Sequence, residues 1–269
     1  MTELPRTPLA IVHARRLEGE DTPFYGALEG DEITPLGTSP FSESIRLRGK
    51  ERVPLRAVRL LPPVVPSKVC AIGKNYRDHV KEMGSDAPPP EPIMFLKPSS
   101  AVIGPEAPIR LPSISERVEY EAEMALVIGR RCRRVSESEA ASVILGVTAL
   151  NDVTARDLQR RDGQWSRAKG FDTFCPLGPA IVLGLDFRGL RVTSRVNGET
   201  KQDGNTRDLI FPVERLIAHV TACMTLYPGD VIATGTPSGV GPLEPGDRIE
   251  VEVEGVGTLS NPVMADTDA

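Results

Sequence analysis

The sequence predicts a mostly β fold with short helices, an α+β class. The 269-residue chain contains 24 glycines and 25 prolines, which favour short strands and tight turns over long helices. Residues 190–198 and 249–257 alternate apolar and polar side chains and end in glycine turns, as half-buried strands do. Residues 212–226 form the best amphipathic helix of the chain.

The chain is predicted to contain two units. The stretch FYGALEGDEITPL (residues 24–36) reads as a strand, a turn and a second strand, so residues 1–64 are expected to form a small β-rich domain. The proline-rich stretch LRAVRLLPPVVPSK (residues 55–68) reads as an extended connector. Residues 65–269 then form the larger domain.

Within the larger domain, short elements follow one another. The expected strands are residues 68–73, 93–104, 118–129 and 178–184. Residues 76–84 can form two helical turns closed by Gly84. Residues 136–150 begin with Ser/Glu capping signals and pass into an apolar run, and residues 151–163 read as a short helix.

Bulk properties exclude several classes of function. A net charge of −5 gives no electrostatic case for nucleic acid. No apolar run approaches the ~18 residues of a membrane span, so no membrane partner is expected. The four cysteines lie far apart without a C-x-x-C pair, which gives no support to zinc or dithiol redox chemistry. We expect a cytoplasmic protein with reduced thiols.

Carboxylates gather in the segment VEYEAEMALVIG (residues 118–129). On a strand, Glu121 and Glu123 share a face roughly 6.5–7 Å apart and can converge on one ion. Asp152 follows another apolar run, where a helix begins. Three carboxylates without His or Cys suit Mg²⁺ or Mn²⁺. The alternative is that these glutamates, with Glu119, form the polar face of an edge strand.

His79 precedes Glu82 by three residues, so on a helix the carboxylate can orient the imidazole as in a general base. An ordinary charged surface helix is the alternative. Arg156, Gln159 and Lys169 lie in a cation-rich segment that could bind an acidic substrate or an oxyanion, or could be solvated. The segment IATGTPSGVG, which includes Thr236, offers clustered backbone N–H groups or simply two tight turns.

The order of these motifs resembles the fumarylacetoacetate hydrolase family over roughly residues 66–264. The motifs that carry the resemblance are AIGKNYRDHVKEMG, IMFLKPSSAVIG, VEYEAEMALVIG, LNDVTARDLQ, AKGFDTFCPLGP, VNGE and ATGTPSGVG. The resemblance implies a β-roll catalytic domain and usually a homodimer. It implies that Glu121, Glu123 and Asp152 bind Mg²⁺ or Mn²⁺; Glu119 falls outside this set.

The resemblance also implies roles for other residues. His79 and Glu82 would form a catalytic pair on a lid, and Lys169 would stabilise an oxyanion. Arg156, Gln159 and Thr236 would contact the substrate, a small 2-oxo acid or dicarboxylate. The expected chemistry passes through an enolate that the metal stabilises, in hydrolysis of acylpyruvates or decarboxylation of oxaloacetate.

Two alternatives to this function remain open. Within the family, the chain could be the 2-hydroxyhepta-2,4-diene-1,7-dioate isomerase or the 5-carboxymethyl-2-oxo-hex-3-ene-1,7-dioate decarboxylase of homoprotocatechuate catabolism. From another class, it could be a non-catalytic, metal-stabilised binding protein. Such a protein would need the three carboxylates but not the His79–Glu82 pair.

Overall fold

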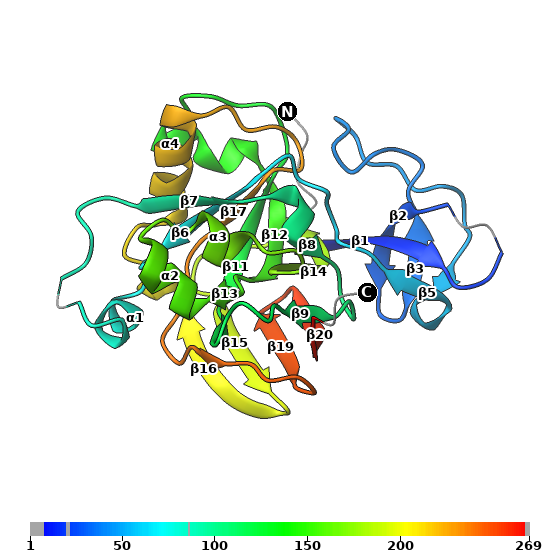
Figure 1. Cartoon of the computed structure of the whole chain (residues 1–269). Helices are drawn as coiled ribbons and strands as arrows, with labels where there is room; N and C mark the ends of the chain where they lie inside the picture. The colour runs from blue at the N-terminus through cyan, green and yellow to red at the C-terminus, as the bar shows by residue number, and fades with distance from the viewer. Residues whose placement is uncertain (1–7, 20–21, 86, 267–269) are drawn as a thin grey trace.

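The computed structural model describes residues 8–19, 22–85 and 87–266. Within them the chain forms many short strands and few helices (Figure 1), so the predicted fold class is confirmed. The helical elements are α1 (Arg77–Glu82), α2 (Arg156–Asp162), α3 (Ser166–Gly170), α4 (Val213–Cys223), and the 3₁₀ turns η1 (Leu55–Ala57), η2 (Ser99–Ala101), η3 (Glu137–Val143) and η4 (Thr206–Asp208).

The largest sheet has twelve strands, ten of them in the order β4-β3-β2-β1-β14-β12-β11-β17-β6-β7. Two further strands join it at the side, where β5 pairs with β1 and β8 pairs with β14. These strands are β1 (Leu9–Arg16), β2 (Phe24–Glu29), β3 (Glu32–Pro35), β4 (Val53–Pro54), β5 (Val58–Leu60), β6 (Val69–Gly73), β7 (Ile93–Lys97), β8 (Val102–Ile103), β11 (Ala122–Ile128), β12 (Ile144–Asn151), β14 (Cys175–Leu183) and β17 (Val231–Ala233).

The N-terminal strands β1 to β5 lie to one side of the larger body (Figure 1). They nevertheless belong to the large sheet, because β1 pairs antiparallel with β14 and places Leu9 opposite Leu183 and Ile11 opposite Ile181. The division of the chain at residue 64 stays a prediction.

A second sheet of five strands faces the centre of the large one. Its order is β16 (Glu199–Asn205), β15 (Arg191–Val196), β19 (Arg248–Val253), β20 (Gly257–Ala265), β9 (Ile109–Leu111). Inward side chains such as Val192 and Val251 pack in one apolar cluster with Met124 and Leu126 of β11. The apolar positions predicted on one face of β15 and β19 therefore contribute to this core, and burial alternates along β19.

The helices close the remaining sides of the core. In α4, residues Val213, Leu216, Ile217 and Val220 are buried, as its amphipathic pattern predicts. The 3₁₀ turn η3 packs beside α4 and begins with a capping box between Ser136 and Glu139, which the sequence also predicted.

The segment 118–129 is not one strand. Residues Val118–Tyr120 form β10, which belongs to a three-stranded sheet with β13 (Thr154–Ala155) and β18 (Gly241–Pro242). The strand β11 starts at Ala122 in the large sheet. Glu121 lies at the joint, so strand alternation alone does not set its direction, and the expectation of a single strand was wrong here.

Candidate active site

Three carboxylates meet where β11 and β12 run side by side. Glu121 and Glu123 flank the start of β11, and Asp152 directly follows β12. Ladder pairing of Ala122 with Asn151 brings these ends together. Glu121, Glu123 and Asp152 are all buried, and one carboxylate oxygen from each lies within 4.8 Å of the others. The structure thus brings together the three residues predicted as metal ligands.

Two buried lysines hold Asp152. Lys169 Nζ, from α3, donates to Asp152 Oδ2 at 2.7 Å and to Glu121 Oε2 at 2.9 Å. Lys97 Nζ, at the end of β7, donates to Asp152 Oδ1 at 2.6 Å and to the carbonyl oxygen of Val153 at 3.2 Å. Each oxygen of Asp152 therefore accepts a hydrogen bond from a lysine, which fixes the orientation of the carboxylate and leaves a lone pair on each oxygen.

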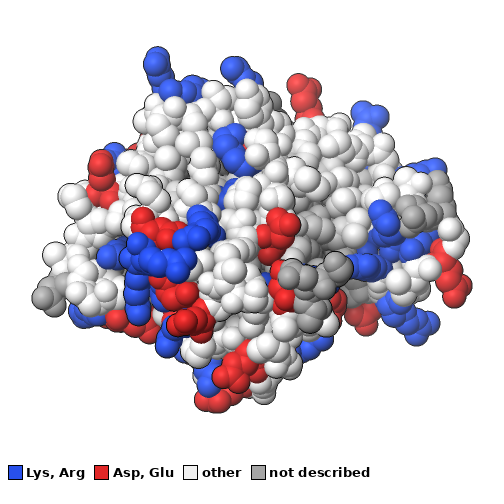
Figure 2. Space-filling view, in the orientation of Figure 1, with Lys and Arg blue, Asp and Glu red and all other residues white. Residues whose placement is uncertain are grey.

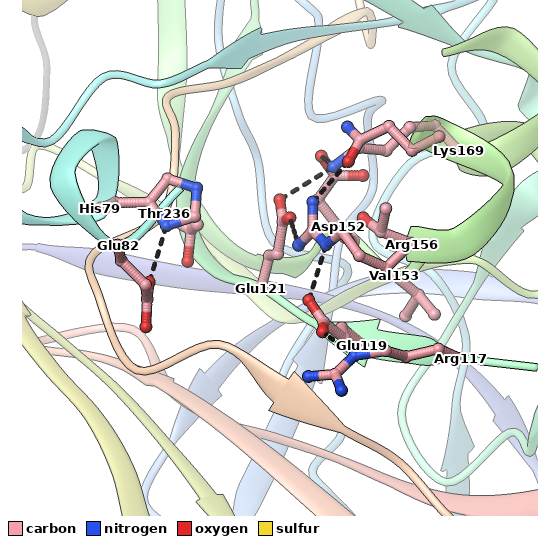
Figure 3. Close-up of polar contacts among 12 residues, drawn as sticks. His79, Glu82, Arg117, Glu119, Glu121, Asp152, Val153, Arg156, Lys169 and Thr236 are labelled. Atoms are coloured by element: carbon pink, nitrogen blue, oxygen red, sulfur yellow. Dashed lines mark hydrogen bonds and ion pairs between the residues drawn. The ribbon is translucent and has the colours of Figure 1, made fainter. Parts of the chain in front are cut away.

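Arg156 opens helix α2 and is almost fully buried. Its Nε donates to Glu119 Oε2 at 2.6 Å, its Nη1 to Gln159 Oε1 at 2.6 Å, and its Nη2 to Glu121 Oε1 (Figure 3). Arg117 Nε in turn donates to Glu119 Oε1 at 2.5 Å. A chain of alternating charge thus runs from the surface at Arg117 to the carboxylate of Glu121.

Neighbouring charges set the protonation of these groups. Burial raises the pKa of Glu121, but the adjoining Lys169 and Arg156 charges outweigh it and hold that pKa below its usual range. Burial lowers the pKa of Lys169, but the negative charges of Asp152 and Glu121 raise it by more, so the net shift is upward. Glu121 and Lys169 are therefore an ionised pair at neutral pH.

Glu123 differs from the other two carboxylates. Burial and the charges of Asp152 and Glu121 raise its pKa well above the usual value. Its Oε2 accepts the N–H of Gly235 at 2.7 Å, and none of the described residues forms an ion pair with it. Gly235 has φ +101° and an added Cβ would lie 2.7 Å from Asn75, so only glycine fits there.

The donor set fits a hard dication. An all-oxygen triad with one carboxylate that lacks a cationic partner among the described residues is what Mg²⁺ or Mn²⁺ would complete. Without a metal ion, Lys97, Lys169 and Arg156 offset the charges of Asp152 and Glu121, but none of the described cations pairs with Glu123.

His79 and Glu82 lie on α1 and form the predicted pair. His79 Nδ1 is 3.0 Å from Glu82 Oε2, and His79 is 4% exposed. The other oxygen of Glu82 accepts the backbone N–H of Gly239 at 2.9 Å. Burial raises the pKa of Glu82, while the hydrogen bonds from His79 and Gly239 lower it to below its usual range. An ionised Glu82 can only accept a hydrogen bond, so it favours the His79 tautomer in which Nδ1–H donates to Oε2 and Nε2 carries the lone pair of a base.

Thr236 is held in place by one backbone contact and one side-chain contact. Its hydroxyl donates to the carbonyl oxygen of Ala122 at 2.8 Å and accepts from Gln202 Nε2 at 2.7 Å. Gln202 Oε1 also accepts the N–H of Ala122 at 2.9 Å. This bridge ties the β16 edge to the start of β11, next to the triad.

These side chains surround one cavity of about 170 Å³. The predicted residues that line it are His79, Glu121, Glu123, Arg156, Gln159, Lys169 and Thr236. The others, Glu82 and Asp152, contact lining residues from behind. In Figure 3, Glu121 lies between the His79–Glu82 pair and the Lys169–Arg156 side. Site residues predicted from segments up to 157 positions apart thus share one cavity.

Sequence reasoning missed several residues of this site. Lys97 ends an apolar strand and is wholly buried; a charge in that position was the available signal. Glu119 was set aside, although it is 3% exposed and binds Arg156. Further lining residues were not identified as part of the site: Ile72, Gly73, Lys74, Met83 and Trp165. Arg160, which shares a helical face with Arg156 and Gln159 in the cation-rich segment, lines the cavity as well.

Basic and acidic side chains adjoin one another on the face shown in Figure 2. None of the helices in the described part of the chain has the length and apolar character needed to cross a bilayer.

The fold and the site together define a class: a β-roll protein with a buried acidic triad beside a histidine–glutamate pair. A model described as fumarylacetoacetate (FAA) hydrolase C-terminal matches residues 68–264, and a model described as Rv2993c-like, N-terminal matches residues 15–63. The chain belongs to the fumarylacetoacetate hydrolase family, and the predicted resemblance is confirmed.

Three relatives illustrate the range of the family. The human protein named oxaloacetate tautomerase FAHD2A, mitochondrial, is 44% identical over 225 residues, which cover 79% of this chain and 71% of that protein. A crystal structure of 2-hydroxyhepta-2,4-diene-1,7-dioate isomerase from Mycobacterium marinum is 42% identical with a TM-score of 0.88, covering 97% of this chain and all of that one. A maleylpyruvate hydrolase from Sphingobium sp. SYK-6, in complex with manganese(II) and pyruvate, is 32% identical with a TM-score of 0.76, covering 95% and 100%.

Proposed function

We propose that the chain is a Mg²⁺- or Mn²⁺-dependent enzyme that acts on 2-oxo acids through an enolate, with oxaloacetate-like dicarboxylates as its substrates. The observation that carries the proposal is that Glu121 and Glu123 of the acidic triad line the same cavity as His79, while Asp152 and Glu82 contact lining residues from behind. A binding protein stabilised by metal would need only the triad. A histidine held by a carboxylate beside it supplies a base.

Glu121, Glu123 and Asp152 would hold the dication. When bound, Mg²⁺ or Mn²⁺ supplies Lewis-acid polarisation of the substrate's keto group. Lys97 and Lys169 keep Asp152 in place, and Arg156 keeps Glu121 in place. The manganese and pyruvate named with the Sphingobium enzyme support a 2-oxo acid at the same position.

His79 moves the proton. With Nδ1 bound to Glu82, its Nε2 takes a proton from C3 of the keto acid, and the electron pair remains as the enolate. Return of that proton to the oxygen gives the enol, which is tautomerisation. In decarboxylation, carbon dioxide leaves C3 and its bonding electron pair forms the enolate; His79 Nε2, which first takes a proton from solvent, then delivers that proton to C3. Lys169, charged and buried, stabilises oxyanion character on the substrate.

Two cations favour a substrate with a second carboxylate. Lys74 and Arg160 line the cavity, and neither forms an ion pair with a described residue. Arg156 and Lys169, by contrast, are matched by Glu119, Glu121 and Asp152. An unmatched positive charge on a cavity wall favours an anionic group on the ligand. The relatives named oxaloacetate tautomerase, from human, rat and cattle, agree with this substrate class.

Acylpyruvate hydrolysis is the second candidate, favoured by the maleylpyruvate hydrolase neighbours. In that reaction His79 would deprotonate a water that attacks the distal carbonyl. The apolar lining residues Ile72, Met83 and Trp165 suit the uncharged tail of such a substrate. The dioate isomerase named for the Mycobacterium marinum structure marks the third possibility within the family.

A substrate panel with Mg²⁺, read by product mass and by enol absorbance, separates these reactions. We expect turnover of oxaloacetate to exceed that of acetylpyruvate, which has the same 2-oxo acid head and a neutral tail. Lys74→Gln and Arg160→Gln should each raise KM for oxaloacetate roughly 10-fold and leave KM for acetylpyruvate unchanged. The control is Arg161→Gln, since Arg161 is outside the cavity and pairs with Asp162. A faster reaction with acetylpyruvate would contradict the dicarboxylate assignment.

The homodimer, the cytoplasmic location and the small-molecule partner expected from the sequence stay predictions. The oligomeric state follows from light scattering of the purified chain, and any mass other than that of two chains would contradict the dimer.

A further inference from the structure

Glu119 is a buried carboxylate that the proposed reaction does not use. It belongs to β10, outside the strand that carries Glu123, and pairs in the ladder with Thr154 and Pro242. Both of its oxygens are engaged by arginines, Oε2 by Arg156 at 2.6 Å and Oε1 by Arg117 at 2.5 Å. The two arginines differ, because the Arg156 side chain is 2% exposed and that of Arg117 is 51% exposed.

The contacts of Arg156 leave little freedom to its guanidinium. A guanidinium has five N–H groups in one plane. Nε donates to Glu119, one Nη1 hydrogen to Gln159 and one Nη2 hydrogen to Glu121. Three contacts to three separate residues define the plane, so the two remaining N–H groups, one on each Nη, have fixed directions. Arg156 lines the cavity, and its two remaining N–H groups have no hydrogen-bond partner among the described residues.

Glu119 also determines how Arg156 shares its charge. Arginine prefers bidentate pairing with one carboxylate, in which two parallel N–H groups meet two oxygens. Because Nε is held by Glu119, Arg156 offers Glu121 only Nη2. Glu121 Oε2 is then left to Lys169, at 2.9 Å. Without Glu119, Arg156 could rotate and bind both oxygens of Glu121 with two parallel N–H groups.

We propose that Glu119 is a positioning residue, which acts through Arg156 to aim two N–H groups at the ligand and to prevent Arg156 from closing over Glu121. The inference rests on the proposed function in one respect: the ligand is taken to be a 2-oxo acid held beside the triad. Arg117 assists from the surface by fixing the second oxygen of Glu119.

A double-mutant cycle tests this role with a binding readout. Oxalate, which resembles the enolate of pyruvate, is titrated calorimetrically in the presence of Mn²⁺, and Mn²⁺ affinity is measured separately. Glu119→Ala should weaken oxalate binding roughly 10-fold in the wild-type background, because Arg156 loses its orienting partner. In the Arg156→Met background the same substitution should change oxalate binding by less than about 2-fold, since Glu119 acts only through Arg156.

Two further variants make the result specific. Glu119→Gln keeps an acceptor oxygen for Arg156 Nε, so its oxalate affinity should lie between that of the wild type and that of Glu119→Ala. It also carries the test if Glu119→Ala does not fold. The matched control is Glu116→Ala, an exposed carboxylate three residues away, which should bind oxalate as the wild type does.

The outcomes separate the two proposals. Equal losses of oxalate affinity in the wild-type and Arg156→Met backgrounds would assign Glu119 a general structural role and overturn the inference. Unchanged binding by Glu119→Ala, in an enzyme that binds oxalate, would overturn the inference alone. Failure of the wild-type enzyme to bind oxalate with Mn²⁺ would overturn the proposed function and the inference with it.

Discussion

Among the described residues, two buried carboxylate centres differ in how their charge is compensated. Asp230 is fully buried and accepts hydrogen bonds from Ser67, Tyr227 and Lys68, with Lys68 Nζ at 2.6 Å. One acid there meets one ammonium and several N–H and O–H donors. In the cavity, Glu123 meets one backbone N–H and two like charges. The closed centre stabilises the fold, whereas the open one is short of positive charge.

This contrast teaches how a structural acid and a functional acid can be told apart. Buried acids are stable when their charge is matched nearby. A buried acid that stays unmatched costs stability, and such a cost is typical of sites that bind an ion or substrate. The following predictions test the contrast, beginning with the largest expected effect.

Removal of divalent metal should abolish activity. Treatment with EDTA leaves the triad without its dication, and addition of Mn²⁺ should restore turnover. Turnover of oxaloacetate before and after chelation measures the effect. The fold should persist in EDTA, because the Asp230 centre needs no metal; full activity in the chelated enzyme would disprove the metal role.

His79→Ala should lower kcat by about 10²–10⁴, as loss of a general base does. Mn²⁺ affinity should stay near that of the wild type, since His79 bonds to Glu82 and to none of the three carboxylates. The matched control is Lys81→Ala on the same helix, an exposed residue that pairs with Asp78. Turnover equal to the wild type would remove His79 from the mechanism.

Glu123→Gln should separate stability from function. The raised pKa of Glu123 means that the metal-free fold favours its neutral form, which glutamine imitates. In EDTA the variant should therefore unfold at a Tm equal to or above that of the wild type. The increase in Tm on addition of Mn²⁺ should disappear, because one ligand is lost. A lower Tm in EDTA would show that the carboxylate is already compensated.

Asp230→Asn, unlike Glu123→Gln, should lower stability and spare activity. We expect a loss of about 2–3 kcal/mol in the free energy of unfolding and little change in kcat. Burial raises the pKa of Asp230, but bonds from Lys68 and Ser67 lower it to below its usual value. Its contribution is therefore complete above the unfolded pKa of roughly 3.9 and is lost as pH falls through the lower folded pKa. Urea unfolding at pH 6 and pH 3 should show the wild type and variant converging in acid.

Local patterns predicted much of the site. His79 and Glu82 are three residues apart on a short helix, and their contact follows from helical spacing. Glu123 and Asp152 were placed by the apolar strands that precede or contain them. The same holds for β19, where burial follows the predicted alternation, whereas in β15 Val192, Thr193 and Ser194 are all buried.

Contacts between distant segments could not be predicted in this way. Lys97 reaches Asp152 across 55 positions, and nothing near either residue encodes that pairing. The break between β10 and β11 places Glu119 in a different sheet from Glu123, where it reaches Arg156 at the start of α2. Strand periodicity assumes a continuous strand, so it fails at the residue where the chain changes sheets.

The hydrogen bonds between β1 and β14 have a consequence for any shortened form of this protein. If the segment before residue 64 were removed, β14 would become an exposed sheet edge at the apolar residues Ile181, Val182 and Leu183. The unpaired N–H and C=O groups of such an edge can pair with a strand of another chain. We therefore expect a variant without residues 1–64 to keep the cavity but to aggregate through the exposed edge of β14.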